Sequence, residues 1–88
     1  MKLKEGVFLH HVGEDYMGVT QGEAARSFNG LIRNNQTADE IYRLLAEETT
    51  EEAVVEAMVQ QYDAPREVIA RDVHRVIDRI RQAGLLDE

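Results

Sequence analysis

Histidine is the residue type in this 88-residue chain that could most directly bind a metal ion or transfer a proton. Two of its three histidines, His10 and His11, are adjacent in the run EGVFLHHV, which is rich in strand-forming residues. Neighbouring side chains of a strand point to opposite faces, so the two rings cannot easily share one ion. His74 has no histidine or cysteine four residues away. We therefore expect no metal site.

The carboxylates gather where helices are expected to begin, as Asp39-Glu40 and as Glu51-Glu52. Acidic side chains stabilise a helix when they lie near the positive end of its dipole. This role explains the positions of these carboxylates better than acid–base catalysis does. The chain has no cysteine, no calcium-binding loop, no phosphate-binding glycine loop and no serine elbow. Its only serine, Ser27, lacks the Asp-Ser-Leu context of phosphopantetheine carriers. We expect neither an enzyme nor a cofactor.

The chain is acidic, with a net charge of −7, and this charge limits its partners. Nucleic-acid phosphates and anionic membranes would be repelled at long range. No apolar run approaches the ~20 residues that span a bilayer, and the N-terminal MKLKEGVF lacks the apolar centre of a signal peptide. These features predict a cytoplasmic protein.

Basic charge is concentrated near the C-terminus. Half of the ten basic residues fall in one expected helix and its first turn, namely Arg66, Arg71, Arg75, Arg79 and Arg81. Pairing with carboxylates on the same helix would leave them as ordinary solvated charges. At 100° per residue, however, Val68, Asp72, Arg75 and Arg79 share one flank of the apolar stripe. This flank could form one lip of a groove for an apolar and acidic peptide.

Three strands are expected in the first part of the chain: Glu5–Val12, Tyr16–Thr20 and Ser27–Arg33, with a turn at Gly13–Asp15 and a loop at 21–26. In the third strand Phe28, Gly30 and Ile32 would face the helices, and Asn29, Leu31 and Arg33 the opposite side. A helix through GEAARSFNGLI is the alternative. Asn29 and Gly30 in its interior count against it, because the glycine alone costs roughly 1 kcal/mol.

Three helices are expected in the second part of the chain. Thr37-Ala38-Asp39-Glu40 resembles a capping box that opens the first helix, and Thr49-Thr50-Glu51-Glu52 repeats the signal for the second. The third helix is expected from Pro65 to Ala83, with Gly84 ending it and Leu85-Leu86 folding back onto it. Their apolar stripes are Ile41, Leu44 and Leu45; Val54, Val55, Met58, Val59 and Tyr62; and Ile69, Val73, Val76, Ile77 and Ile80. The order of elements predicts a single α+β domain over residues 1–88, a three-stranded antiparallel N-terminal sheet followed by three helices.

The chain resembles the family of pyrroloquinoline quinone biosynthesis protein D (PqqD), peptide chaperones whose fold is the RiPP recognition element. In that family a third strand runs through an Asn-x-Thr-like turn into a helix with an EI-aromatic-x-LL pattern. A threonine-capped helix ending in Tyr-Asp follows, and the last helix ends in x-GLL. The matching positions here are Asn35-Gln36-Thr37, Glu40-Ile41-Tyr42-Arg43-Leu44-Leu45, Thr50, Tyr62-Asp63 and Gly84-Leu85-Leu86. The resemblance covers nearly the whole chain.

The resemblance implies a winged-helix-like domain that binds the leader segment of a ribosomally made precursor peptide. It also implies that the domain presents this peptide to a modifying enzyme, commonly a radical SAM enzyme. The leader would add as an extra strand along the third strand and pack against the third helix. The expected peptide-binding residues are Ser27, Phe28, Asn29, Gly30, Leu31, Ile32, Arg33, Val68, Ile69, Asp72, Arg75, Val76 and Arg79.

A winged-helix DNA-binding regulator is the alternative, because it shares a small sheet and three helices. A DNA-binding protein of this kind requires positive charge on its recognition helix and wing, whereas the expected second helix of this chain is acidic. An unpaired strand edge can also pair with its own copy, so we expect a monomer or a weak dimer.

Overall fold

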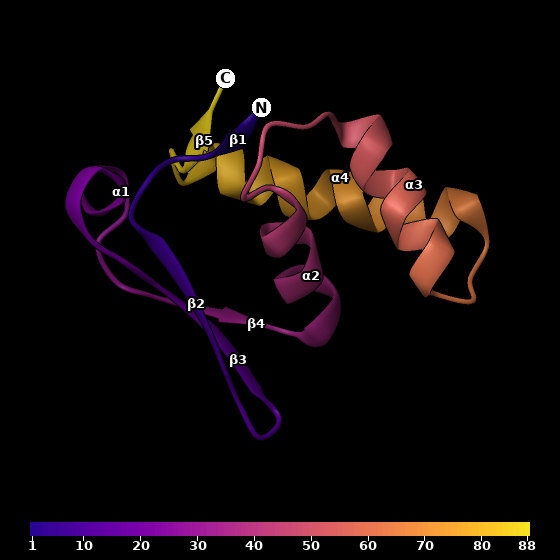
Figure 1. Ribbon diagram of the computed structural model, residues 1–88, viewed down its shortest axis with the longest axis horizontal. Helices are drawn as coiled ribbons and strands as arrows, with labels where there is room; N and C mark the ends of the chain where they lie inside the picture. The colour runs from indigo at the N-terminus through magenta and orange to yellow at the C-terminus, as the bar shows by residue number, and fades with distance from the viewer.

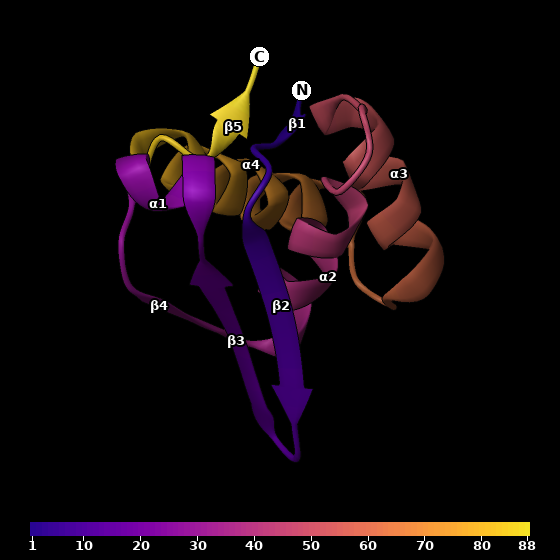
Figure 2. The same ribbon diagram turned by 60° about the vertical axis from the view of Figure 1, so that its left-hand side comes forward.

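A computed structural model describes all residues, 1–88, as one α+β unit (Figure 1). The elements are β1 (Lys2–Leu3), β2 (Val7–Val12), β3 (Asp15–Thr20), α1 (Gly22–Ser27), β4 (Leu31–Asn34), α2 (Gln36–Leu44), α3 (Glu51–Gln61), α4 (Arg66–Gln82) and β5 (Leu86–Asp87). The β2–β3 hairpin extends past the helices, and α4 passes behind β1 and the start of β2 when the molecule is turned (Figure 2). None of the helices is long and apolar enough to cross a membrane.

The main sheet is an antiparallel meander in the order β2-β3-β4, as the sequence predicts. The hairpin register runs from Val7 opposite Thr20 to Val12 opposite Asp15. Strand β4 then pairs with β3 from Leu31 opposite Val19 to Asn34 opposite Tyr16. Strand β3 is therefore central, and β2 and β4 each have one edge without a strand partner.

The connection between β3 and β4 differs from the expected loop. A short helix, α1, occupies Gly22–Ser27 and buries Ala24 completely. The helical alternative was therefore partly right, because α1 ends before Asn29 and Gly30 and so avoids their cost. After α1 the backbone becomes extended at Phe28, whose carbonyl oxygen accepts a hydrogen bond of 2.6 Å from the Thr20 hydroxyl. The expected strand Ser27–Arg33 is thus wrong in its first four residues.

Helix α2 begins earlier than the expected capping box. Its N-cap is Asn35, whose side-chain oxygen accepts a hydrogen bond of 2.7 Å from the Ala38 amide, so Thr37 lies inside the helix. Asparagine caps at least as well as threonine, so the cap nearer to the strand is used. The second cap is as expected, since the Thr50 hydroxyl accepts from the Ala53 amide at 3.1 Å.

The end of α4 confirms the expected glycine cap. Gly84 has a φ of 75°, its amide donates to the Arg81 carbonyl at 2.9 Å, and the Leu85 amide donates to the Ile80 carbonyl at 3.1 Å. These two bonds form a Schellman motif. Leu85 and Leu86 are consequently buried, and Leu86 pairs with Leu3 in the small β1–β5 sheet, which the sequence did not predict.

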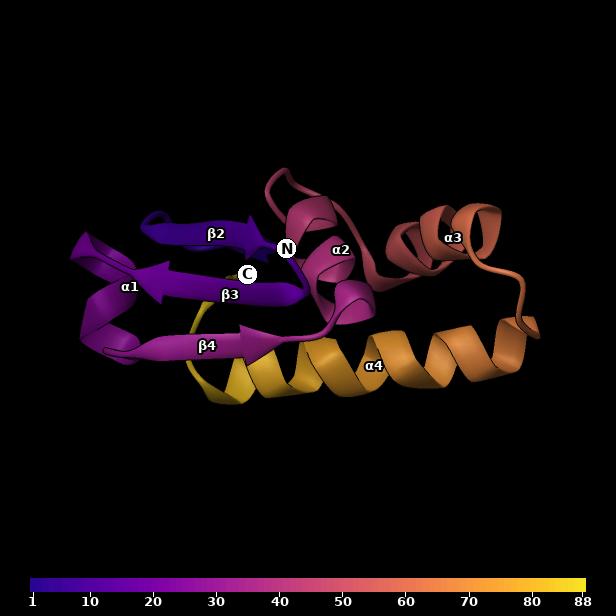
Figure 3. The ribbon, with the colours of Figure 1, turned by 90° about the horizontal axis from the view of Figure 1, so that it is seen from below.

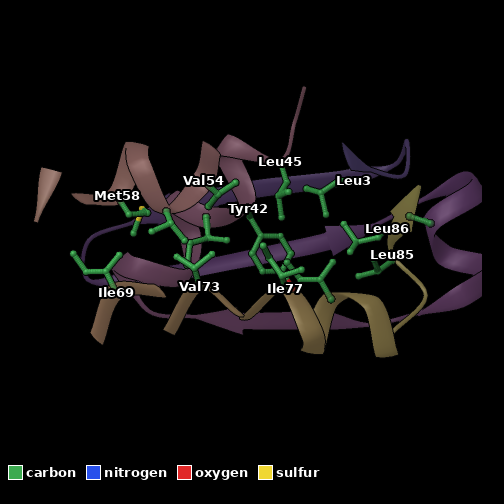
Figure 4. Packing of buried hydrophobic residues seen from close by; sticks show 14 residues of the cluster. Leu3, Tyr42, Leu45, Val54, Met58, Ile69, Val73, Ile77, Leu85 and Leu86 are labelled. Atoms are coloured by element: carbon green, nitrogen blue, oxygen red, sulfur yellow. The ribbon is translucent and has the colours of Figure 1, made fainter. Parts of the chain in front are cut away.

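The core is one cluster of apolar side chains contributed by the helices and the two chain ends (Figure 4). The expected stripes of α3 and α4 supply its centre, with Met58, Val73, Ile77 and Ile80 all at most 1% exposed. Tyr42 is also buried, although the expected α2 stripe did not include it. Val7, Leu9 and Ile32 pack against this cluster from the sheet, so one sheet face covers it.

Because Tyr42 is buried, its phenol is expected to make the stability of the fold depend on pH in the alkaline range. Burial raises the pKa of its phenol above 10.0, because the phenolate loses hydration, and the positive charge of Arg79 acts in the opposite direction. A raised folded-state pKa means that the contribution to stability is complete below pH 10.0 and is lost as the pH rises through the folded-state pKa. We expect the urea midpoint of the wild type to fall above about pH 10, and that of Tyr42→Phe to fall less. If the urea midpoints of the two proteins fell equally with pH, the pH dependence could not be assigned to Tyr42.

We predict that only glycine fits at Gly6, because of its backbone conformation and of the atoms close to it. It has a φ of 103°, and a Cβ atom there would lie 1.9 Å from the Gln21 carbonyl oxygen. Gly13 is the matched control, because its φ of 61° is also positive but no atom lies within 4 Å of the added carbon. Gly13→Ala should lower the free energy of unfolding by about 1–2 kcal/mol through backbone strain alone. Gly6→Ala should lower it by roughly 3 kcal/mol or more in urea unfolding; equal losses would show that the close contact is unimportant.

Candidate functional site

The free edge of β4 is the first feature of the candidate site. In an antiparallel pair, alternate residues direct their backbone amide and carbonyl groups away from the partner strand. Strand β4 pairs only with β3, so the remaining edge groups of Leu31–Asn34 have no strand partner. Seen from below, the order across the molecule is β2, β3, β4 and then α4 (Figure 3). The open edge therefore faces the side on which α4 runs.

Two hollows lie along α4, and one of them reaches the residue that follows β4, Asn35. A mainly apolar hollow of about 150 Å³ is lined by Thr37, Met58, Tyr62, Ala64, Val68, Ile69, Asp72 and Val73. A more polar one of about 180 Å³ joins the first turn of α2 to α4 and is lined by Asn35, Thr37, Ala38, Asp72, Arg75, Val76 and Arg79. Both include Thr37 and Asp72, so together they form one continuous depression, the α4 groove.

The wall that α4 contributes agrees with the helical-wheel analysis. All six of the expected helix residues line the groove: Val68, Ile69, Asp72, Arg75, Val76 and Arg79. Val68 is 38% exposed, whereas Ile69 is buried, so the groove borders directly on the core. The apolar part lies toward the start of α4 and the arginines lie toward its end.

The groove carries an excess of positive charge in an otherwise acidic molecule. Arg75 forms an ion pair of 3.4 Å with Asp72, and both side chains are about half exposed. Arg79 is exposed and has no carboxylate within ion-pair distance. One carboxylate thus balances only one of the two arginines, and the polar part of the groove can accept a further negative charge.

The strand residues are brought to this site only in part. Leu31, Ile32 and Arg33 lie in β4, with Ile32 packed against the core and Leu31 and Arg33 exposed on the opposite face, as predicted. Ser27 instead ends α1, and Phe28, Asn29 and Gly30 form the connection to β4. Phe28 packs against the core as expected, whereas Gly30 is exposed and belongs to no strand face.

Sequence reasoning missed the residues that line the opposite wall of the groove. They are Asn35, Thr37 and Ala38 in the N-cap and first turn of α2, and Met58, Tyr62 and Ala64 at the end of α3 and in the loop that follows it. The α2 residues could have been found, because a helix that begins directly after an edge strand must place its first turn beside the end of that strand. The α3 residues depend on how α3 packs against α4, for which the sequence has no local signal.

Outside the groove the histidines make local contacts, such as that of His74 with the Glu51 carboxylate at 3.1 Å. His10 and His11 lie on opposite faces of β2, and the His11 ring stacks on Tyr16 with centroids 4.0 Å apart. No group of three or more His, Cys, Asp or Glu side chains is placed to hold a metal ion. A larger, open hollow of about 790 Å³ beside α3 is lined by glutamates and by Arg66, which pairs with Glu56.

Comparisons with known proteins identify the family and the fold of this chain. The family model described as Coenzyme PQQ synthesis protein D (PqqD) matches residues 5–86. Among solved structures, "TbiB1 in Complex with the TbiA(beta) Leader Peptide" is similar with a TM-score of 0.77. That match covers 99% of this chain and 95% of the other at 20% sequence identity, a level that shows a shared fold. No curated protein matches the chain in sequence.

The resemblance that the sequence motifs indicate is therefore confirmed at the level of the family. The match extends from before β2 into β5, so it includes β4 and the three helices α2, α3 and α4, which line the groove. The chain belongs to the PqqD family.

Proposed function

We propose that this protein is a non-enzymatic peptide chaperone, which binds the leader segment of a ribosomally synthesised precursor peptide. The leader adds as a strand to the free edge of β4 and places side chains in the α4 groove. The observation that carries this proposal is the position of an unpaired strand edge beside a groove with an apolar part and an unbalanced arginine. Strand addition supplies affinity through main-chain hydrogen bonds, and the groove supplies specificity.

The groove also limits the chemistry of the leader. Its apolar part, next to Val68 and Ile69, accepts an apolar anchor side chain, and Arg75 and Arg79 accept a carboxylate. From Val68 to Arg75 or Arg79 the helix rises by roughly 10–16 Å. An extended chain covers that distance in about three to five residues. We therefore infer a leader with an apolar residue and an acidic residue at about this spacing.

The bound leader is presented to a modifying enzyme, which we propose to be a radical SAM enzyme. Membership of the PqqD family supports a role in this kind of biosynthesis, as does the fold shared with TbiB1, which binds the TbiA(beta) leader peptide. Because the precursor is made on the ribosome, the cytoplasm is the compartment in which the two would meet. Outside the proposed complex the protein is a monomer or a weak dimer.

The arrangement of charges does not favour the DNA-binding alternative. Three of the five arginines at or in α4 already pair with carboxylates, namely Arg66 with Glu56, Arg75 with Asp72, and Arg81 with Glu88. A net charge of −7 adds long-range repulsion from phosphates.

The direct test is an NMR titration of the labelled protein with the leader peptide encoded beside this gene. We expect shift changes at Leu31–Asn34 and along α4 from Val68 to Arg79, with few changes in the β2–β3 hairpin turn. A peptide that binds without perturbing β4 or α4 would disprove the proposed site, and a peptide that does not bind would disprove the proposed function.

Charge reversal at Arg79 is predicted to weaken leader binding. Arg79→Glu should raise the dissociation constant about tenfold or more, the loss typical of a hydrogen bond to a charged group. Arg71→Glu is the matched control, because Arg71 is exposed on the same helix, lies outside the groove and changes the net charge equally. Fluorescence anisotropy with the labelled leader would measure both. Equal weakening in the two variants would attribute the effect to net charge rather than to the groove.

A further inference from the structure

The main sheet has an outward face that the α4 groove does not use. Side chains alternate along a strand, and the register aligns them across the three strands. Because Val7, Leu9 and Ile32 face the core, their neighbours in sequence face away from it. The outward face therefore consists of the row Phe8, Val19 and Leu31, the row His10, Met17 and Arg33, and the pair Val12 and Asp15.

This outward face is unusually apolar for a surface without a cover. The protein has four exposed large hydrophobic residues, and three of them lie here: Phe8 at 49%, Val12 at 67% and Leu31 at 47% exposed. Viewed from below, the three strands lie in front of the helices and no helix covers them (Figure 3). Isolated exposed apolar residues are common, but an apolar row that crosses all three strands, here Phe8, Val19 and Leu31, is typical of an interaction surface.

The charges on this face favour a particular kind of occupant. Arg33 is exposed and forms no ion pair, and His10 lies in the same row, whereas Asp15 is the only carboxylate of the face. The rest of the molecule carries the acidic charge, so two copies of the chain repel each other with −7 on each. A different protein whose apolar contact surface carries carboxylates would complement Arg33.

The outward face is also continuous with the proposed leader site. Leu31 and Arg33 belong to β4, whose free backbone edge is the one proposed to receive the leader. A strand added there would continue the two side-chain rows of the sheet. A protein seated on the outward face would therefore also contact alternate side chains of the bound leader.

We propose that the outward face, centred on Phe8, Val12 and Leu31, is the docking surface for the enzyme that modifies the precursor peptide. The partner's contact surface is apolar with carboxylates that reach Arg33. The identity of the partner rests on the proposed function, whereas the location of the surface rests on the exposure and register of the sheet.

The test uses matched serine substitutions at exposed apolar residues. Phe8→Ser and Val12→Ser remove apolar area from the outward face, on β2, away from the free edge of β4. Val68→Ser removes apolar area from the α4 groove, because Val68 is the fourth exposed large hydrophobic residue and lines that groove. Biolayer interferometry would measure binding to the purified modifying enzyme encoded beside this gene, without leader, and anisotropy would measure leader binding. Circular dichroism would confirm that each variant is folded.

We expect Phe8→Ser to weaken enzyme binding about tenfold, Val12→Ser to weaken it in the same direction, and both to keep the leader affinity of the wild type. Val68→Ser should show the reverse pattern. Enzyme binding that is unchanged in both hairpin variants, or absent in the wild type, would overturn the proposal while leaving the leader measurement intact. Sedimentation of the wild type as a dimer that Phe8→Ser dissociates would also overturn it, because the face would then join two copies of this chain.

Discussion

The burial of one stripe of α4 is the interaction on which the rest of the structure depends. Ile69, Val73, Ile77 and Ile80 are at most 6% exposed, and α2, α3 and the sheet pack against the same cluster. Burying four such side chains contributes on the order of 6–12 kcal/mol, which is comparable with the net stability of a whole small domain. Because this stripe is committed to the core, the neighbouring flank of α4 is held in a fixed position beside β4. The groove is therefore a by-product of the packing that makes the domain stable.

The helical half of the fold and the α4 wall of the site could be predicted from the sequence, because both depend on a single periodicity. The positions of Val68, Asp72, Arg75 and Arg79 on one flank follow from 100° per residue and need no knowledge of the neighbours. Thr50 and Gly84 mark helix ends through local hydrogen bonds, which are equally visible in the sequence. The family motifs indicated the fold for the same reason, since they consist mainly of such caps and core positions.

The segment from Gly22 to Gly30 could not be predicted in the same way. A six-residue helix has too few turns for a periodic signal, and its formation depends on the burial of Ala24, a contact with distant parts of the chain. The choice between Asn35 and Thr37 as the cap of α2 likewise depends on where β4 ends, which β3 determines through its register. The opposite wall of the groove, with Met58 and Tyr62, arises only when α3 and α4 meet.

The pairing of β1 with β5 brings the two ends of the chain side by side, as Figure 1 shows. The β2–β3 hairpin and each helix close short loops, whereas β1 and β5 must close a loop that contains every other element. The entropic cost of closure grows with loop length, so this small sheet is expected to form after the core has assembled. Local opening of its two residue pairs would expose Leu3 and Leu86, which are otherwise buried in the core cluster.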